Sequence, residues 1–233
     1  MKYFKIQIKT IYQDNNRISS SVNGENINNA DDYFIKMDNG DIVYDAPIFD
    51  YFYLESFDDE KYWEWLLVDV FDFTGKGSRI PGWLISRRLK GIFEKFKIAE
   101  PHFYYSSKLL YKGEKLDYYI FQFSGDKFLN PLVNYINFNQ SLYFDPNQNI
   151  NFEIQDVEDL KIQTKKIFKE SGFNVINILI KKLVINDDID FISMQNFLGD
   201  KLVSERLKNV IEENGISGFE FSELDYDVVI GKP

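Results

Sequence analysis

The sequence predicts an α+β fold, with mixed and antiparallel sheets and a few packed helices, in which two related halves are merged into one domain. Three observations predict this fold. Apolar and polar residues alternate with period two in several segments, which is typical of strands. In other segments the apolar residues recur at helical spacing. One helical segment of fifteen residues also occurs twice, at 84–98 and at 202–216.

The first third of the chain is predicted to consist mainly of strands. Residues 1–10 alternate between apolar and polar side chains and predict a strand. The segment 14–29 is rich in Asn and Ser and predicts a loop, whereas 41–49 and 62–73 predict two further strands. The run 74–79 contains Gly and Lys but lacks the glycine spacing of a phosphate-binding loop, so it is interpreted as a turn.

A capped helix is predicted to begin after Ser86. A serine at this position can accept a hydrogen bond from a backbone N–H of the first helical turn. Leu89, Ile92, Phe93 and Phe96 follow at intervals of three and four residues and form one apolar stripe. We therefore expect this helix to pack its stripe against a sheet.

The remaining elements follow from the same two patterns. A hairpin is predicted across 103–123, with a Gly-containing turn in its middle, and strands are predicted at 135–144 and 175–185. The segment 158–170 predicts a helix that ends at Gly172, since glycine commonly terminates helices.

The repeated segment is the most informative feature of the sequence. Residues 84–98 align without a gap onto 202–216, at an offset of 118, and seven of the fifteen positions are identical. The identities include the two cap serines, Ser86 and Ser204, and the arginine two positions after each of them. Chance repetition of a common amphipathic helix is the alternative explanation.

Because the offset is close to half the chain length, we expect two pseudo-repeat halves, 1–150 and 151–233. Each lone helix stripe is too small to make its own core. The halves are therefore expected to form a single domain over residues 1–233.

Composition excludes several classes of protein. The 233 residues include no Cys and one His, so disulfides, thiolate metal sites, thiol nucleophiles and multi-histidine metal sites are excluded. The 27 basic and 37 acidic side chains give a net charge of −10, which disfavours general nucleic-acid binding. No signal sequence or long apolar run is present, so we expect a cytoplasmic protein with no membrane partner, no metal and no cofactor.

Residues with potential chemistry also have simpler explanations. Ser86 with Arg88, and Ser204 with Arg206, can mark anion sites at helix N-termini, but a serine in this position is ordinarily a cap. His102 is the only candidate imidazole base, and it precedes an aromatic strand in which packing explains it as well. We therefore expect no catalytic residue and no enzymatic activity.

The segment from Asp45 to Asp72 is the candidate binding surface. It holds nine acidic residues against one lysine, interleaved with aromatic residues. Charges of this kind steer encounters with a basic protein, and aromatic side chains anchor it. Alternatively, the rings lie in the core and the acids simply face water. The predicted contact residues are Asp50, Glu55, Asp58, Asp59, Glu60, Tyr62, Trp63 and Glu64.

The segments 82–94, 102–104 and 202–221 carry a resemblance to a known family. Together they are similar to the eleventh immunity-protein family of bacterial polymorphic toxin systems, and the forty-third immunity family is also close. The most specific part is Ser-x-Arg-Leu-Lys followed by Gly-Ile-x-Gly-hydrophobic-x-Phe. The motif residues, which we interpret as structural, are Ser86, Arg88, Leu89, Ser204, Arg206, Leu207, Gly218 and Phe221.

The resemblance implies an α+β immunity protein that binds a cognate toxin domain and neutralises it by stoichiometric occlusion. The acidity of the chain favours a basic toxin domain, and the sequence leaves the oligomeric state open. On this interpretation, changing Asp58, Asp59 and Glu60 to Lys slows association with the toxin. Two alternatives are kept: an enzyme that uses carboxylates in a surface cleft, for example to reverse a toxin's modification, and an interaction module without a toxin partner.

Overall fold

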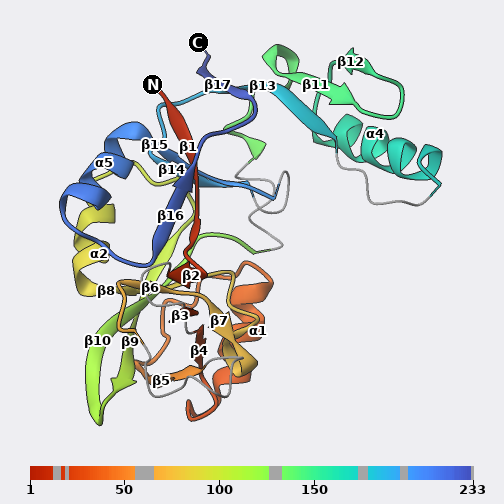
Figure 1. The fold of residues 1–233 in the computed structure, drawn as a ribbon. Coiled ribbons are helices and arrows are strands. Elements are labelled where there is room, and N and C mark those ends of the chain that lie inside the picture. The colour runs from red at the N-terminus through yellow and green to blue at the C-terminus, as the bar shows by residue number, and fades with distance from the viewer. Residues whose placement is uncertain are drawn as a thin grey trace.

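The computed structural model describes residues 1–12, 17–18, 21–55, 66–125, 133–172, 178–194 and 199–231 (Figure 1). Within these ranges the chain forms sheets of seven, four, four and two strands, in which most strand pairs are antiparallel and a few are parallel. Four α-helices pack against the larger sheets within the same ranges. The predicted α+β class is therefore confirmed.

The helices are α1 (Ala30–Asp38), α2 (Arg87–Phe93), α4 (Val157–Glu170) and α5 (Glu205–Glu213), with 3₁₀ turns at Gly75–Gly77 and Phe138–Gln140. The strands are β1 (Tyr3–Ile8), β2 (Ile11–Tyr12), β3 (Arg17–Ile18), β4 (Ser21–Asn23), β5 (Phe49–Glu55), β6 (Val70–Phe71), β7 (Phe73–Thr74), β8 (Gly82–Ser86), β9 (Phe103–Tyr111), β10 (Glu114–Gln122), β11 (Leu142–Asp145), β12 (Ile150–Phe152), β13 (Leu179–Ile185), β14 (Phe191–Ser193), β15 (Lys201–Ser204), β16 (Phe219–Ser222) and β17 (Asp227–Ile230).

Three hydrophobic cores follow one another along the molecule. In Figure 1, α1, β4 and β5 lie at the bottom, α4 with β11 and β12 lies at the upper right, and α2 and α5 lie next to each other at the left. The central core is enclosed by α2, α5, the sheet β14-β15-β1-β16 and one face of the seven-stranded sheet β6-β8-β10-β9-β5-β4-β7. The core at the α4 end lies between the sheet β12-β11-β13-β17 and the second face of the sheet β14-β15-β1-β16, and the first turn of α4 packs against it.

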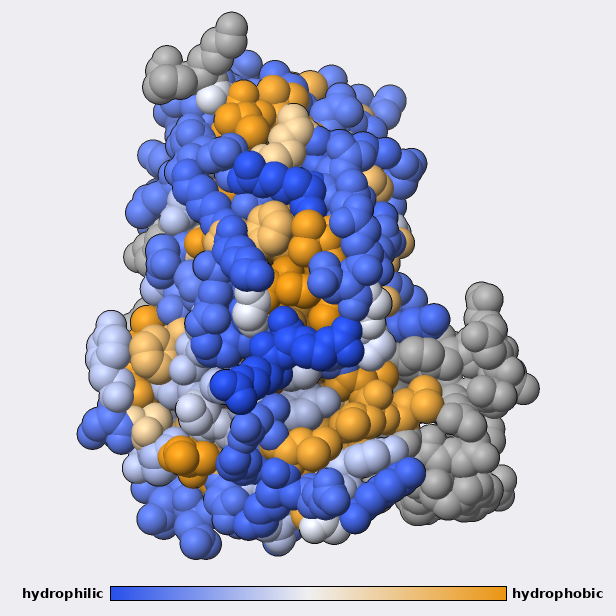
Figure 2. All heavy atoms as spheres, turned by 90° about the vertical axis from the view of Figure 1, so that its left-hand side faces the viewer, coloured by the Kyte–Doolittle hydropathy of each residue, from blue (hydrophilic) through white to orange (hydrophobic). Residues whose placement is uncertain are grey.

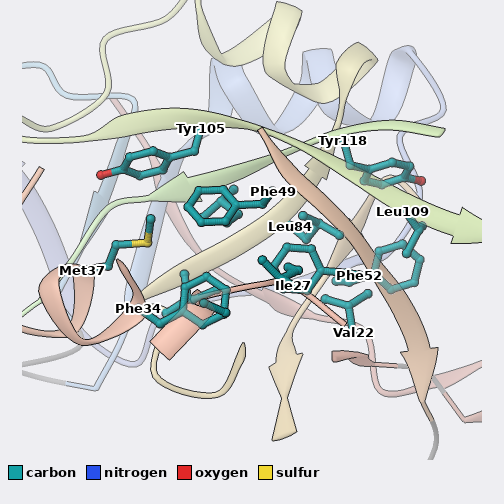
Figure 3. Packing of buried hydrophobic residues seen from close by; sticks show 14 of the residues in the cluster. Val22, Ile27, Phe34, Met37, Phe49, Phe52, Leu84, Tyr105, Leu109 and Tyr118 are labelled. Carbon is teal, nitrogen blue, oxygen red and sulfur yellow. The ribbon is translucent and has the colours of Figure 1, made fainter. Parts of the chain in front are cut away.

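The core at the α1 end is rich in aromatic side chains. Phe34 and Met37 project from α1 toward Phe49 and Phe52 of β5, as Figure 3 shows, and all four are fully buried. The Phe34 ring lies 5.7 Å from that of Phe49 and 6.1 Å from that of Phe52. Tyr105 of β9 closes this core from the sheet side. Aromatic burial on this scale fixes α1 firmly against β5.

Elements with strong local signals are confirmed. The hairpin 103–123 forms as β9 and β10, with Lys112 and Gly113 in its turn. The predicted helix at 158–170 forms as α4, and Gly172 beyond its end has a φ of +68°. The helix after Ser86 forms as α2, although it ends at Phe93 and leaves Phe96 beyond it.

Several elements of the first third of the chain differ from the prediction. Residues 41–48 form a loop, in which Val43 is buried and Ile42 half-buried while Tyr44 and Ile48 are exposed, and only Phe49 begins a strand. Helix α1 was not predicted, although Ala30, Phe34 and Met37 follow at helical spacing; no side-chain hydrogen bond caps its start. The predicted loop at 14–29 contains β4. Residues 62–65 of the predicted strand 62–73 lie outside the described residues.

The two copies of the repeated segment occupy matching positions in two units of four strands and one helix. The first unit comprises β6, β8, α2, β9 and β10, and its strand order is β6-β8-β10-β9. The second unit comprises β14, β15, α5, β16 and β1, and its strand order is β14-β15-β1-β16. Neighbouring strands are antiparallel throughout both units. Strand β1 thus completes the second unit, although it comes from residues 1–150.

Candidate protein-binding surface

The motif serines are helix caps with the same three hydrogen bonds in both units. Ser86 Oγ accepts from Leu89 N at 3.2 Å, and Ser204 Oγ accepts from Leu207 N at 3.2 Å. Each hydroxyl also donates to a buried carboxylate at 2.6 Å, that of Asp69 for Ser86 and that of Asp190 for Ser204. The N–H of each serine donates to the carbonyl oxygen of the same aspartate at 2.8 Å.

Each unit completes the aspartate site of the other. Ser217, which follows α5, donates its N–H to Asp69 Oδ2 at 3.0 Å, and its carbonyl oxygen accepts from Asp69 N at 3.1 Å. Lys97, which follows α2, donates its N–H to Asp190 Oδ2 at 3.0 Å, and its carbonyl oxygen accepts from Asp190 N at 2.7 Å. Burying a carboxylate costs free energy unless hydrogen-bond donors satisfy its oxygens. The two aspartates therefore join the units reciprocally.

The remaining contacts of the units also correspond in pairs. Tyr118 of β10 donates its hydroxyl to Val68 O at 2.6 Å, and Tyr3 of β1 donates its hydroxyl to Ile189 O at 2.8 Å. Val68 and Ile189 each stand immediately before the buried aspartate. This correspondence shows that β1 occupies the same position in the second unit as β10 does in the first.

The motif lysines lie between equivalent rings. Lys90 pairs with Glu94 and lies over the rings of Tyr104 and Tyr119. Lys208 pairs with Glu212, 2.6 Å away, and lies over the rings of Phe4 and Phe221. The motif residue Phe221 therefore packs beneath a lysine at the position that Tyr104 occupies in the first unit.

The two motif arginines differ in their contacts. Arg88 donates to the carbonyl oxygen of Asn214, at the end of α5, at 2.7 Å. Arg206 binds both carboxylate oxygens of Asp190 within its own unit, and these hydrogen bonds raise the pKa of Arg206. Both arginines therefore make structural contacts.

Leu89, Leu207 and Gly218 complete the motif. The two leucines are fully buried in the central core. Gly218 has a φ of +101°, and a Cβ there would lie 2.8 Å from Val70 Cγ1. Only glycine fits this close approach. On the face that carries α2 and α5, hydrophilic spheres dominate and hydrophobic ones show in separate patches (Figure 2).

His102 packs among rings. Its ring centroid lies 5.5 Å from that of Tyr104 and 6.0 Å from that of Phe121, and its Nδ1 is 3.4 Å from Glu100 Oε1. Three shallow pockets of roughly 170–240 Å³ involve β13, β17 or α4, and neither His102 nor Arg88 lines any of them. Among the described residues, no three His, Cys, Asp or Glu side chains are grouped to hold a metal ion.

The predicted contact residues divide into two groups. Asp50 is exposed on β5 and pairs with Lys115, whose Nζ is 2.7 Å from Asp50 Oδ2, and Glu55 accepts a 2.8 Å hydrogen bond from Asn23. Asp50 lies near the start of β5 and Glu55 is its last residue, so the two lie near opposite ends of this strand, and Glu55 is half-buried. The others lie outside the described residues: Asp58, Asp59, Glu60, Tyr62, Trp63 and Glu64.

Two acids at the end of the predicted segment differ in their surroundings. Asp69 is the buried carboxylate of the first unit, so it is structural. Asp72 is exposed and lies close enough to Lys201 of β15 for the two charges to interact. Periodicity gave no signal for the role of Asp69, because this role depends on strands distant in sequence.

The acidic character of the α1 end extends beyond the predicted segment. Residues 21–55 contain eight acidic side chains and one lysine, a net charge of −7. Glu25, Asp31, Asp32, Asp45 and Asp50 are exposed. Two of the ion pairs here are long, Asp31 with Lys76 at 3.8 Å and Asp38 with Arg79 at 4.0 Å, and exposed pairs of this kind contribute little. We call residues 21–55 the acidic lobe.

The opposite end of the molecule carries little net charge. Residues 157–182 contain six lysines and three acidic side chains, and most of α4 is exposed. Residues 142–156, which include β11 and β12, add three acidic side chains and no lysine, so 142–182 are neutral overall. The acidic lobe and α4 lie at opposite ends of the molecule (Figure 1), so a basic protein is attracted more strongly to the lobe.

No family model matches this chain, and no curated protein sequence matches it significantly. The resemblance to immunity proteins therefore stays a prediction. Within the described residues, no helix is both long and apolar enough to span a bilayer. The fold and the surface define a class, an α+β protein with two interlocked repeat units and one strongly acidic lobe.

Proposed function

We propose that this chain is an immunity protein that binds a cognate bacterial toxin and neutralises it by stoichiometric occlusion. The observation that carries the proposal is the acidic lobe, which concentrates a charge of −7 in residues 21–55. A surface of this kind attracts a basic protein domain and raises its rate of association. The resemblance in the repeated segments supports the same role.

The other observations favour binding over catalysis. The motif residues are engaged in caps, buried hydrogen bonds and ring contacts, so they hold the fold together. The pockets named above are open and small, whereas sites for small molecules usually enclose about 300–1,000 Å³. A broad charged surface suits a protein partner better than a small substrate.

The test is binding to the C-terminal domain of the protein encoded by the neighbouring gene, followed by neutralisation of that domain's toxicity at different molar ratios. We expect a stable complex and full protection at one equivalent. Protection by far less than one equivalent would contradict occlusion and support the enzymatic alternative. Absence of binding would contradict the immunity role.

Charge reversal tests the part played by the acidic lobe. Changing Glu25, Asp32 and Asp45 to Lys should slow association about tenfold or more at low salt and flatten its salt dependence, because long-range attraction is lost. The matched control changes Glu153, Glu158 and Glu170, near or on α4, to Lys, which alters the net charge equally. If both triple variants slow association to the same extent, net charge rather than the lobe governs binding.

A further inference from the structure

The loop between α1 and β5 presents the most exposed large apolar side chain in the described part of the protein. Tyr44 is 80% exposed, and Ile48, four residues further on, is 62% exposed. Pro47 and Asp45 beside them are exposed as well. Apolar side chains scattered singly on a surface are ordinary, but two on one short loop in the acidic lobe call for a physical account.

A buried hydrogen-bond network holds the base of this loop. Gln122 of β10 is fully buried, and its Nε2 donates to Met37 O at 3.1 Å and to Asp41 O at 3.3 Å. Its Oε1 accepts from the Tyr105 hydroxyl at 2.7 Å. The same hydroxyl accepts from Val43 N at 3.1 Å. Burial raises the pKa of Tyr105, so the hydroxyl keeps the proton that it donates.

Packing holds the loop above this base. Val43 is 7% exposed and belongs to the core at the α1 end. Ala46 N donates to Val43 O at 3.2 Å, which closes the turn around Tyr44. The Tyr44 ring meets the edge of Phe103 with ring centroids 5.6 Å apart. The ring is therefore positioned by a neighbour, although most of its surface faces water.

A buried glutamine is costly unless its amide groups are satisfied, and a satisfied network specifies one conformation. Here the network and Val43 together hold the loop in a shape that leaves Tyr44 and Ile48 in water. A loop that is ordered before binding loses less conformational entropy when a partner covers it. Tyrosine is one of the residue types that contribute most of the binding free energy at protein interfaces.

We propose that Tyr44 and Ile48 form the anchor of the toxin complex and insert into an apolar recess whose rim carries Lys or Arg facing Asp45. This inference rests on the proposed function and adds to it the contact residues and the chemistry of the partner's surface. Charge complementarity with the acidic lobe brings the partner to this loop. The anchor then determines how long the complex lasts, because short-range contacts act mainly on dissociation.

The test measures dissociation from the C-terminal domain of the neighbouring gene product. Tyr44→Ala should raise the dissociation rate about thirtyfold or more, as is usual when a hot-spot residue is lost, and Ile48→Ala should raise it severalfold. The matched control is Ile162→Ala on α4, where the isoleucine is also 62% exposed, and it should leave the rate unchanged. Association rates should stay within a factor of three in all three variants.

The outcomes separate the two proposals. If the wild-type protein does not bind, the proposed function fails. If it binds and Tyr44→Ala dissociates at the wild-type rate, the anchor is wrong while the proposed function stands. If Ile162→Ala accelerates dissociation as much as Ile48→Ala does, the contact surface lies elsewhere.

A second variant tests the ordering of the loop without a partner. Tyr105→Phe removes the acceptor of Val43 N and one contact of Gln122. Amide exchange at Val43 should then quicken at least tenfold, while exchange at Ile85, in strand β8 on the far side of β10, stays unchanged. Slow exchange at Val43 in both proteins would show that the network does not hold the loop, and would overturn this part of the inference.

Discussion

At the scale of single residues, the hydroxyls of Ser86 and Ser204 each connect a helix to a carboxylate. Each hydroxyl accepts from the first turn of its helix and donates to a buried aspartate. A serine before an apolar stripe predicted the first contact from local spacing. The second could not be predicted, because Asp69 and Asp190 are brought beside the serines only by the pairing of β6 with β8 and of β14 with β15.

We expect Ser86→Ala and Ser204→Ala to destabilise the protein by similar amounts, each by about 1–3 kcal/mol. Loss of a cap costs about 1 kcal/mol, and a buried carboxylate deprived of one donor adds to it. Urea denaturation measures both changes. Ser78→Ala serves as a control, since its hydroxyl donates only to the exposed turn carbonyl of Gly75. A difference of more than about 2 kcal/mol between the two variants would contradict equivalent roles.

Lys201 makes the stability of the folded protein depend on pH. Its Nζ lies 5.9 Å from the centroid of the Trp83 ring, and desolvation lowers the pKa of Lys201 although Asp72 opposes this. A lysine whose pKa is lowered by folding destabilises the folded state while it is charged, and this penalty fades once it loses its proton above the folded-state pKa.

We therefore expect Lys201→Met to be more stable than the wild type at pH 7, with the advantage shrinking as the pH rises toward the ordinary pKa of lysine, near 10.5. Chemical denaturation at pH 7 and pH 10 measures the difference. Lys165→Met, on the exposed side of α4, controls for the loss of a positive charge. An advantage that grows with pH would contradict the assigned sign.

At the scale of elements, the first strand of the chain belongs with the last ones. β1 pairs with β15 on one side and β16 on the other, and Tyr3 makes the contact that Tyr118 makes in the first unit. Alternation predicted a strand over 1–10. The pairing of that strand could not be predicted, because its partners are some 200 residues away and strand pairing leaves no local signature.

Ile6→Ala should destabilise the protein by about 2–5 kcal/mol, the usual cost of such a truncation in a core. Ile6 is 1% exposed at the centre of β1 and faces the central core. Thermal or urea unfolding measures the effect. Gln7→Ala, at the next position on the exposed side, is the control and should cost less than about 1 kcal/mol. If Ile6→Ala lowers the free energy of unfolding by as little as Gln7→Ala does, β1 contributes little to the second unit.

At the scale of the whole molecule, the two units cannot be separated without opening the central core. The Trp83 ring of the first unit lies 5.4 Å from that of Phe191 and 5.1 Å from that of Phe219, which both belong to the second. The aspartate sites are also completed reciprocally. Each unit therefore depends on the other for packing and for the satisfaction of a buried charge.

The units are accordingly expected to unfold together. Urea transitions followed by tryptophan fluorescence, by circular dichroism and by amide exchange at Ile85 and Val203 should share one midpoint. Coincidence of different probes is the standard sign of a cooperative transition. Separate midpoints for Ile85 and Val203 would show that the units are independent domains.

The sequence by itself determined the α+β class, the repeated capped helix, the central hairpin and the acidity of the first third of the chain. These features rest on local spacing and composition, which act through helix periodicity, strand alternation and capping within a few residues. Only the tertiary structure decided that β1 completes the second unit, that Asp69 is structural, and that Gln122 donates hydrogen bonds to the base of the loop that carries Tyr44. These features depend on strands that are far apart in the chain, and their contacts exist only once long-range pairing has brought the strands together.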